Sequence, residues 1–236
     1  MQLFYINDLE SDFQELGKEE SNHCIRVLRM GVDDELHLTD GSGLLCKARI
    51  VSADSKCCGL QIVERYYDYQ KRNHYLHLAV APTKNMARFE WFLEKAVEMG
   101  IDEITPLICK HSERASINMD RLDKVVVAAM KQSLKAYHPV LHDMTSVREV
   151  MAMDFDGDKL IAHCDKDFGE RAYLGNLVKK GTNTLILIGP EGDFSKEEIN
   201  FAAQNGFKAI SLGRERLRTE TAAVVATTVV STINKL

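Results

Sequence analysis

Short runs of alternating apolar and polar residues fill the first part of the chain. Strands are expected at residues 3–6, 35–39, 44–53 and 57–64, and a helix at residues 18–30. The sequence Asp40-Gly41-Ser42-Gly43 is a turn signal between two of these strands. Short strands joined by tight turns predict a small β-barrel over residues 1–70. Residues 66–73 break the pattern, and we interpret them as a linker.

A different rhythm, in which strands and helices alternate, begins at Tyr75. Further strands are expected at residues 76–80, 104–109, 159–163, 184–188 and 209–212. The run at 184–188 is apolar throughout, which is typical of a parallel strand buried on both faces. Helices are expected after Pro82, from an N-cap at Asp120, after Ser195, and over residues 220–234. This alternation predicts an α/β domain with a mostly parallel sheet over residues 73–236.

Local capping signals mark the ends of several of these helices. Apolar residues recur at helical spacing between Met86 and Val97, and Gly100 follows where a C-terminal cap belongs. Ser195 and Glu198 have the spacing of a capping box. The last helix is apolar on nearly every side, so it needs cover from the core or from a second subunit.

Composition excludes several classes of protein. The chain has 236 residues, of which 45% are hydrophobic and 28% charged, as in an ordinary globular protein. No apolar run approaches the roughly 20 residues that cross a bilayer, and the first residues lack the basic region of a signal peptide. None of the six cysteines forms a C-x-x-C pair. We therefore expect a cytoplasmic protein with reduced thiols, without a disulfide framework or a cysteine zinc site.

Neither the net charge nor the histidines indicate a specific binding or catalytic site. The formal net charge is −5, and no stretch is strongly basic. Binding of nucleic acid would therefore rest on a few placed cations and on shape. We see no metal-binding constellation in the sequence, and we interpret His111, His138 and His163 as structural or surface residues.

Two loops that follow predicted strands, residues 188–194 and 212–221, carry the candidate chemistry. In open α/β sheets, ligands bind beyond the carboxyl ends of strands, and helix starts offer free N–H donors. The standard glycine-rich nucleotide loops are absent, and Glu191 and Asp193 would repel a phosphate. These carboxylates suit a cation or a hydroxyl-bearing group such as S-adenosylmethionine. A tight turn with a solvated Glu191 explains the same residues equally well.

Two motifs in these loops are specific when they occur together. They are Gly189-Pro190-Glu191-Gly192-Asp193-Phe194-Ser195 and Leu212-Gly213 followed by Leu217-Arg218-Thr219-Glu220-Thr221-Ala222. Together they resemble the 16S ribosomal RNA uridine-N3 methyltransferase family, which belongs to the SPOUT superfamily of trefoil-knotted methyltransferases. Weaker matches extend over the whole chain, at His23 with Arg26-Val27-Leu28-Arg29, Lys84, Arg88, Glu90, Glu98, Gly100, Pro106, Glu113-Arg114 and Gln132-Ser133. The chain departs from the family pattern at Asp193, where a glycine is usual, and at Glu215 and Arg216.

The resemblance implies a fold, a cofactor and a partner. The fold would be α/β, with a PUA-like RNA-binding β-barrel at residues 1–70 and a SPOUT methyltransferase domain with a C-terminal trefoil knot at residues 73–236. S-adenosylmethionine would bind within the knot loops of a homodimer. The partner would be 16S rRNA within the small ribosomal subunit, methylated at N3 of a specific uridine.

The resemblance, together with the needs of this reaction, also gives candidate site residues. The catalytic candidates are Arg88, Glu191, Arg218 and Glu220; the cofactor-binding candidates are Gly189, Glu191, Gly192, Leu212, Gly213, Leu217 and Thr219; the RNA-binding candidates are Arg26, Arg29, Lys84 and Arg114. Methylation at N3 needs a base for the N3 proton, or cations that stabilise charge on the ring oxygens. The glutamates suit the first role and the arginines the second. Glu220 could equally favour the start of the last helix through its dipole, and Arg88 could be a solvated side chain.

Two other hypotheses remain open from the sequence. One is a related knotted methyltransferase that acts on another RNA. The other is a non-catalytic ribosome-assembly protein that uses the same two domains to bind RNA. The Glu191-Gly192 and Arg218-Thr219-Glu220 sequences argue against the second, because binding alone does not need a cofactor loop.

Overall fold

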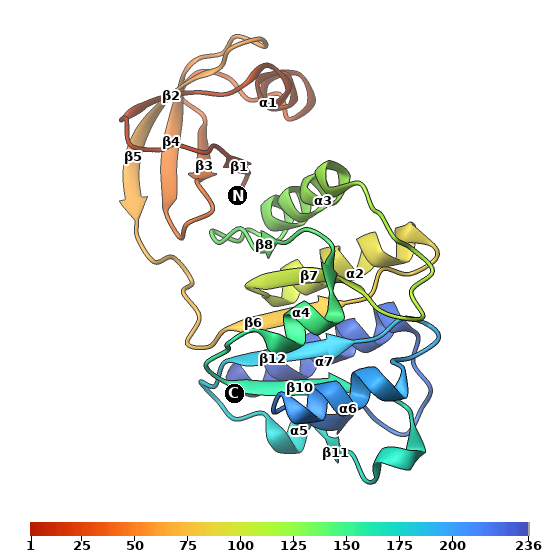
Figure 1. Cartoon of the computed structure of the whole chain (residues 1–236). Coiled ribbons are helices and arrows are strands. Elements are labelled where there is room, and N and C mark those ends of the chain that lie inside the picture. The colour runs from red at the N-terminus through yellow and green to blue at the C-terminus, as the bar shows by residue number, and fades with distance from the viewer. Residues whose placement is uncertain (236) are drawn as a thin grey trace. The chain divides into compact units, whose positions relative to one another are not determined.

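A computed structural model describes residues 1–235 and divides them into two compact units (Figure 1). The first unit contains residues 1–71 and 130–138, and the second contains residues 72–129 and the chain from residue 139 onward. Each unit has a hydrophobic core of its own. No helix among the described residues is both long and apolar enough to cross a membrane.

A five-stranded sheet in the order β1-β3-β4-β5-β2 forms the first unit. Its strands are β1 (Leu3–Tyr5), β2 (Phe13–Glu15), β3 (Glu35–Thr39), β4 (Leu45–Ser52) and β5 (Gly59–Tyr66). β1 pairs with β3 in parallel, and the other neighbours are antiparallel. The core includes the buried thiols of Cys24, Cys46 and Cys58. Burial raises the pKa of Cys24 to about 12, so this residue packs as a neutral thiol.

The helix predicted at residues 18–30 ends earlier in the structure. α1 (Lys18–Asn22) continues as a single π-helical turn at His23–Val27. Arg29 then adopts a φ of 57°, a left-handed conformation that a helix cannot contain. The π turn places Cys24 in the core and leaves Arg26 exposed. The length was mispredicted because the apolar spacing alone does not reveal a backbone reversal.

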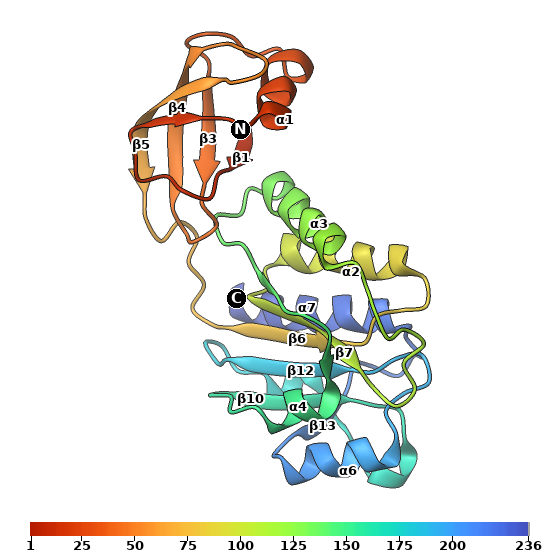
Figure 2. The ribbon, with the colours of Figure 1, turned by 45° about the horizontal axis from the view of Figure 1, so that its top comes forward.

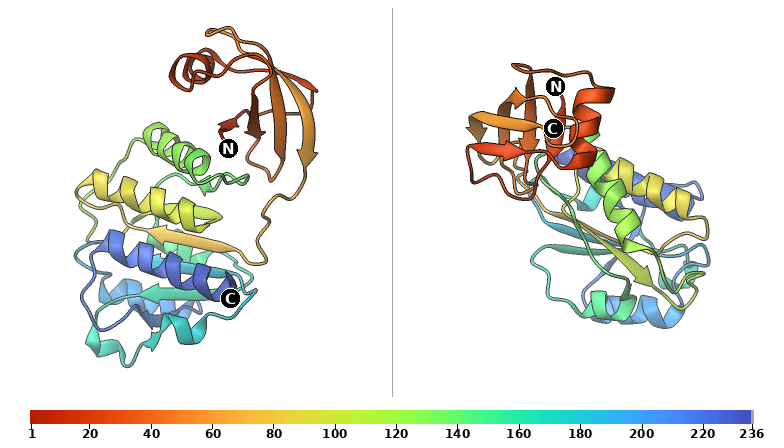
Figure 3. Two further views of the ribbon diagram at one scale, coloured as in Figure 1. Left: turned by 180° about the vertical axis from the view of Figure 1, so that it is seen from behind. Right: turned by 90° about the horizontal axis from the view of Figure 1, so that it is seen from above.

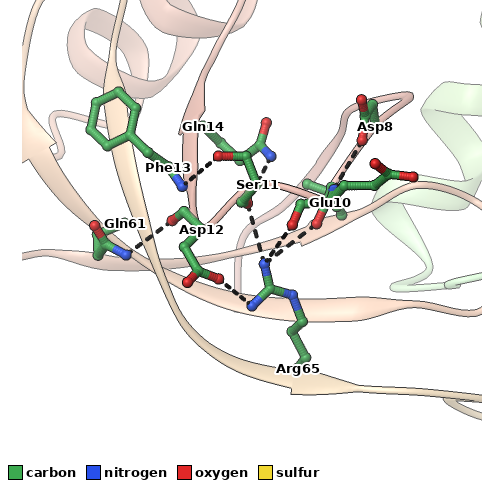
Figure 4. A network of polar contacts seen from close by, with 9 residues as sticks. Asp8, Glu10, Ser11, Asp12, Phe13, Gln14, Gln61 and Arg65 are labelled. Atoms are coloured by element: carbon green, nitrogen blue, oxygen red, sulfur yellow. Dashed lines mark hydrogen bonds and ion pairs between the residues drawn. The ribbon is translucent and has the colours of Figure 1, made fainter.

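Arg65 on β5 hydrogen-bonds the irregular segment of residues 9–12 that precedes β2 (Figure 4). Its Nη1 donates to Asp12 Oδ1 at 2.6 Å. Its Nη2 lies 3.2–3.5 Å from the carbonyl oxygens of Leu9, Glu10 and Ser11. Backbone carbonyls need partners, and a guanidinium has enough donors to serve several of them. One side chain thus replaces the strand pairing that this segment lacks.

Residues 130–138 pack with the first unit although they are distant from it in sequence. The Thr39 hydroxyl donates to the Ala136 carbonyl at 3.2 Å, and the His138 N–H donates to the Gly41 carbonyl at 2.8 Å. Gly41 has a φ of 78°, and a Cβ there would lie 2.7 Å from the His138 Cβ. The close approach of the two segments therefore requires glycine at this position.

The second unit is built on an eight-stranded sheet. Its order is β11-β13-β10-β12-β6-β7-β8, with β9 also paired to β7. The strands are β6 (Leu76–Val80), β7 (Glu103–Ile108), β8 (Val140–Leu141), β9 (Thr145–Ser146), β10 (Asp158–Ala162), β11 (Ala172–Tyr173), β12 (Thr184–Ile188) and β13 (Lys208–Ser211). All of these pairings are parallel, as predicted. β12 has the predicted bounds, and all five of its residues are buried.

Helices cover both faces of this sheet (Figures 1 and 3). They are α2 (Met86–Met99), α3 (Met119–Gln132), α4 (Val147–Ala152), α5 (Leu174–Leu177), α6 (Lys196–Gln204) and α7 (Thr219–Lys235). α2 and α7 pack together on one face, and α4 and α6 pack together on the other (Figure 2). α7 also contacts β6 and β12. The sheet and α2 thus cover the side of α7 that carries Ala223, Ala226 and Val230.

The helix caps agree with the sequence at α6 and differ at α3. Ser195 N donates to Glu198 Oε2 at 2.7 Å and Glu198 N donates to Ser195 Oγ at 3.3 Å, which confirms the predicted capping box. Asp120, the predicted N-cap of α3, lies instead in its first turn. Asn118 caps this helix, because its Oδ1 accepts from the Arg121 N–H at 3.0 Å. Aspartate is favourable both as an N-cap and in the first turn of a helix, so Asp120 by itself does not fix where the helix starts.

Candidate functional site

The loops that follow β6, β7, β10, β12 and β13 meet at one edge of the second unit's sheet. These five strands are parallel neighbours, so their carboxyl ends point to the same edge. Both sequence motifs lie in these loops, after β12 and after β13. Hydrogen bonds between the loops join them into a single site.

A buried hydrogen bond connects the two motifs. Thr219 Oγ1, at the start of α7, donates to the Gly189 carbonyl at 3.1 Å, and only 6% of Thr219 is exposed. A Cβ at Gly189 would lie 3.0 Å from the ring of Phe194, so glycine permits the tight path of the loop after β12. The motif after β12 and the start of α7 are therefore held together.

Glu191 connects the first motif to the loop after β6. Its Oε1 accepts from the Lys84 N–H at 3.1 Å. Arg114, in the loop after β7, donates from Nε and Nη2 to the Lys84 carbonyl at 3.1 and 2.8 Å. The Lys84 side chain itself is 79% exposed and lies 4.0 Å from Glu113. The structure thus brings one predicted catalytic residue and two predicted RNA-binding residues together.

Asp193 occupies a position where the family usually has glycine, and its backbone conformation and hydrogen bonds explain why aspartate is accepted there. Its φ is 62°, a left-handed conformation that aspartate tolerates better than most residues. Its carboxylate accepts from the N–H of Phe194 at 2.8 Å and from the N–H of Cys164 at 2.7 Å. Its carbonyl accepts from Nδ1 of His111 at 3.0 Å. These bonds tie the loop after β12 to the loops after β10 and β7.

Arg88 and Glu220 come from different helices and form a pair. Arg88 lies on α2 and Glu220 in the first turn of α7, with Arg88 Nε 3.9 Å from Glu220 Oε1. The Glu220 side chain is only 8% exposed, whereas that of Arg88 is 43% exposed. The separation is longer than a hydrogen bond, so the two groups attract each other electrostatically without the guanidinium being fixed in one orientation.

The remaining predicted residues are placed as follows. Gly192 is exposed, and a Cβ there would lie 3.0 Å from the His111 Cβ. Leu212 and Leu217 are half-buried, Gly213 and Arg218 are exposed, and all four lie between β13 and α7. Gly213 has a φ of 139°, with open space where a Cβ would point. Arg26 and Arg29 belong to the first unit and are exposed.

Sequence reasoning missed the parts played by His111 and Cys164. Both follow strands whose carboxyl ends border the site, and this position is the signal that could have drawn attention to them. Cys109 also borders the site, but burial raises its pKa to about 12. It is therefore a neutral thiol rather than a nucleophile.

The carboxylates at this edge suit a ligand that carries positive charge. The exposed carboxylate of Glu191 and the largely buried carboxylate of Glu220 both belong to this edge. The open backbone at Gly213 allows a ligand to approach closely. The structure therefore gives S-adenosylmethionine, with its sulfonium, amino group and ribose hydroxyls, a site of fitting chemistry.

Family models match most of the chain. A model described as an RNA methyltransferase domain matches residues 70–231. A model described as an RNA methyltransferase PUA domain matches residues 16–61. These matches confirm the predicted combination of a PUA-like N-terminal domain and an α/β methyltransferase domain.

Individual relatives match along nearly their whole lengths. Ribosomal RNA small subunit methyltransferase E of Rickettsia conorii is 29% identical, over 94% of this chain and 91% of its own. A probable rRNA-methyltransferase from Porphyromonas gingivalis has a similar solved structure, with a TM-score of 0.93, 41% identity, and coverage of 100% and 99%. Ribosomal RNA small subunit methyltransferase E from Neisseria gonorrhoeae, solved with S-adenosyl methionine bound, has a TM-score of 0.86, 25% identity, and coverage of 99% and 98%.

Proposed function

We infer the function of this chain from the family to which it belongs, the RNA methyltransferase domain family, and propose that it methylates ribosomal RNA with S-adenosylmethionine. The acceptor we propose is N3 of a specific uridine in the 16S rRNA of the small ribosomal subunit, in the cytoplasm. The observation that carries the proposal is the bond between Thr219 and Gly189, which joins both motifs at one edge of the sheet. The full-length similarity to small-subunit methyltransferases supports the choice of RNA.

The methyl donor would be held by the loops after β12 and β13. When bound, it supplies a methyl group on a positively charged sulfonium. The residues that would hold it are Gly189, Glu191, Gly192, Leu212, Gly213, Leu217 and Thr219. The glycines would present their backbone, the two half-buried leucines an apolar wall, and Glu191 a negative charge. We further propose that these loops form the trefoil knot of the superfamily.

The acceptor nitrogen gains a methyl group and must lose its proton. We propose that the Glu191 carboxylate takes the proton and passes it to water, because this side chain is exposed and is held in place by the Lys84 N–H. Arg88, which lies 3.9 Å from Glu220, would stabilise the negative charge that develops on the uracil oxygens, and the exposed Arg218 would do so with it. Holding the nitrogen in line with the methyl carbon supplies a further large part of the rate.

The RNA would contact basic side chains on both units. Lys84 and Arg114 lie beside Glu191, and the exposed Arg26 and Arg29 belong to the PUA-like unit. Contacts of this kind position an RNA through its phosphates, while an unstacked base enters the site. We also propose a homodimer, because apolar residues of α7 beyond its buried side remain only half-buried in a single chain.

The test uses the purified chain, labelled S-adenosylmethionine, and small ribosomal subunits from a strain that lacks the enzyme. Mass spectrometry of the digested nucleosides should show 3-methyluridine in the 16S rRNA. Arg88→Ala should lower kcat by about 10²–10³-fold while S-adenosylmethionine still binds. Glu191→Gln should lower kcat by a similar factor and also weaken S-adenosylmethionine binding, because it removes the negative charge that we place beside the donor. Glu94→Gln, which changes an exposed carboxylate on α2, is the matched control and should retain activity.

Other outcomes separate the competing functions. Binding of S-adenosylmethionine without methylation of small subunits, combined with methylation of transfer RNA or large-subunit RNA, would favour a related methyltransferase with another target. Binding of small subunits without any binding of S-adenosylmethionine would favour a ribosome-assembly protein.

A further inference from the structure

Two histidines and a glutamate meet at the amino end of the second unit's sheet. His77 is the second residue of β6, Glu103 is the first of β7, and His142 directly follows β8. One possible ligand atom from each of the three lies within 4.8 Å of the others. His77 and Glu103 lie at the starts of β6 and β7, and the short β8 pairs with the first residues of β7, so the cluster is at the edge opposite the proposed methyltransferase site.

The distances between the possible ligand atoms of the cluster are close to those between ligand atoms in a metal site. His77 Nδ1 lies 3.4 Å from Glu103 Oε2, and His142 Nε2 lies 3.0 Å from the same oxygen. In a tetrahedral zinc site with bonds of about 2.0–2.1 Å, neighbouring ligand atoms are about 3.3 Å apart. The cluster therefore needs only small side-chain shifts to surround an ion.

Neighbouring residues hydrogen-bond the side chains of this cluster, as the residues around a bound metal ion do with its ligands. Nε2 of His77 lies 2.8 Å from the buried Thr105 hydroxyl, so an oxygen partner fixes the ring. The Tyr75 side chain hydrogen-bonds Glu103. Ligating histidines and carboxylates are usually held in this way. His77 is 2% exposed, whereas the His142 side chain is 37% exposed, which gives an ion a path of entry.

We propose that His77, Glu103 and His142 bind one divalent transition-metal ion of the zinc class. Two imidazoles and one carboxylate suit Zn²⁺ and its neighbours better than Mg²⁺ or Ca²⁺, which prefer oxygen ligands. The neutral imidazoles bind the ion through the nitrogens that face Glu103 and keep their proton on the other ring nitrogen, where His77 Nε2–H donates to the Thr105 hydroxyl. Water completes the coordination on the His142 side. The ion joins β6, β7 and the chain after β8, and so stabilises the folded second unit.

The test titrates the full-length protein, stripped with EDTA and dialysed, with ZnCl₂ by calorimetry and with CoCl₂ by absorption spectroscopy. We expect one ion per chain and visible Co²⁺ bands of a tetrahedral site without thiolate charge-transfer absorption. Thiolate bands would place the ion on the exposed Cys57 or Cys164 and would overturn the proposal. Zinc at about a hundredfold excess over Kd should raise the melting temperature by about 5–10 °C.

Variants test the assignment of the ligands. Glu103→Gln keeps the size of the side chain and one acceptor oxygen but removes the charge, and His142→Ala changes a partly exposed residue. Each should weaken zinc and cobalt binding at least about tenfold. His23→Ala, which changes an exposed histidine of the first unit, is the control and should bind as the wild type does. Failure of the wild type to bind, or unchanged affinity in both ligand variants, would overturn the proposal.

Discussion

Replacing Thr219 with valine tests the hydrogen bond that joins the two motifs. The substitution removes one hydroxyl, which donates to the Gly189 carbonyl at 3.1 Å, and nearly keeps the shape of the side chain. Thr219 is 6% exposed and Gly189 is buried, so water cannot easily replace the lost donor. A buried acceptor left without a partner costs about 1–3 kcal/mol. We expect Thr219→Val to lower the free energy of unfolding by that amount and the melting temperature by about 2–4 °C per kcal/mol.

Urea unfolding followed by tryptophan fluorescence is the suitable assay. Trp91 is the single tryptophan of the chain and lies on α2, so its signal reports on the second unit. If the same bond holds the loops ready for S-adenosylmethionine, its loss should weaken binding by up to about tenfold, which corresponds to 1.4 kcal/mol. Thr219→Ser keeps the hydroxyl and should retain most of both quantities. An unchanged midpoint and Kd in Thr219→Val, or an equal loss in Thr219→Ser, would refute this reasoning.

Three further predictions concern the same edge of the sheet. Asp193→Ala should destabilise the chain by about 1 kcal/mol more than Asp193→Gly in urea unfolding, because alanine tolerates a φ of 62° poorly and neither variant keeps the carboxylate's bonds. Ser195→Ala should lower stability by about 1 kcal/mol through loss of the α6 cap, whereas Ser195→Asp should keep most of it. Burial lowers the pKa of His163 below its ordinary 6.5, so the unfolded chain takes up a proton that the folded chain does not. Stability from this group is present above pH 6.5 and declines as the pH falls toward the lowered value; the pH dependence of unfolding should therefore flatten in His163→Gln, and an unchanged slope would contradict this.

Periodicity and capping located the elements that frame the candidate site. β12 has the bounds predicted from its apolar run, and the Ser195–Glu198 capping box begins α6 as predicted. Both signals are short-range, because a strand buried on both faces and a helix cap each depend on residues within a few positions of one another. Short elements were missed for the same reason. β8, β9 and α5 have two to four residues each, too few to show a period.

The sequence by itself determined the α/β class and the two motifs, and the resemblance of these motifs to a known family pointed to the ligand. Only the tertiary structure decided which side chains meet. Lys84 and Glu191 are 107 residues apart, and the carboxylate of Asp193 reaches a loop 29 residues away. His77, Glu103 and His142 show no metal spacing along the chain, yet parallel strands bring their ligand atoms within 4.8 Å. Such contacts follow from strand order, which the hydrophobic spacing of one strand does not encode, because a strand buried on both faces satisfies its own pattern beside any suitable neighbour.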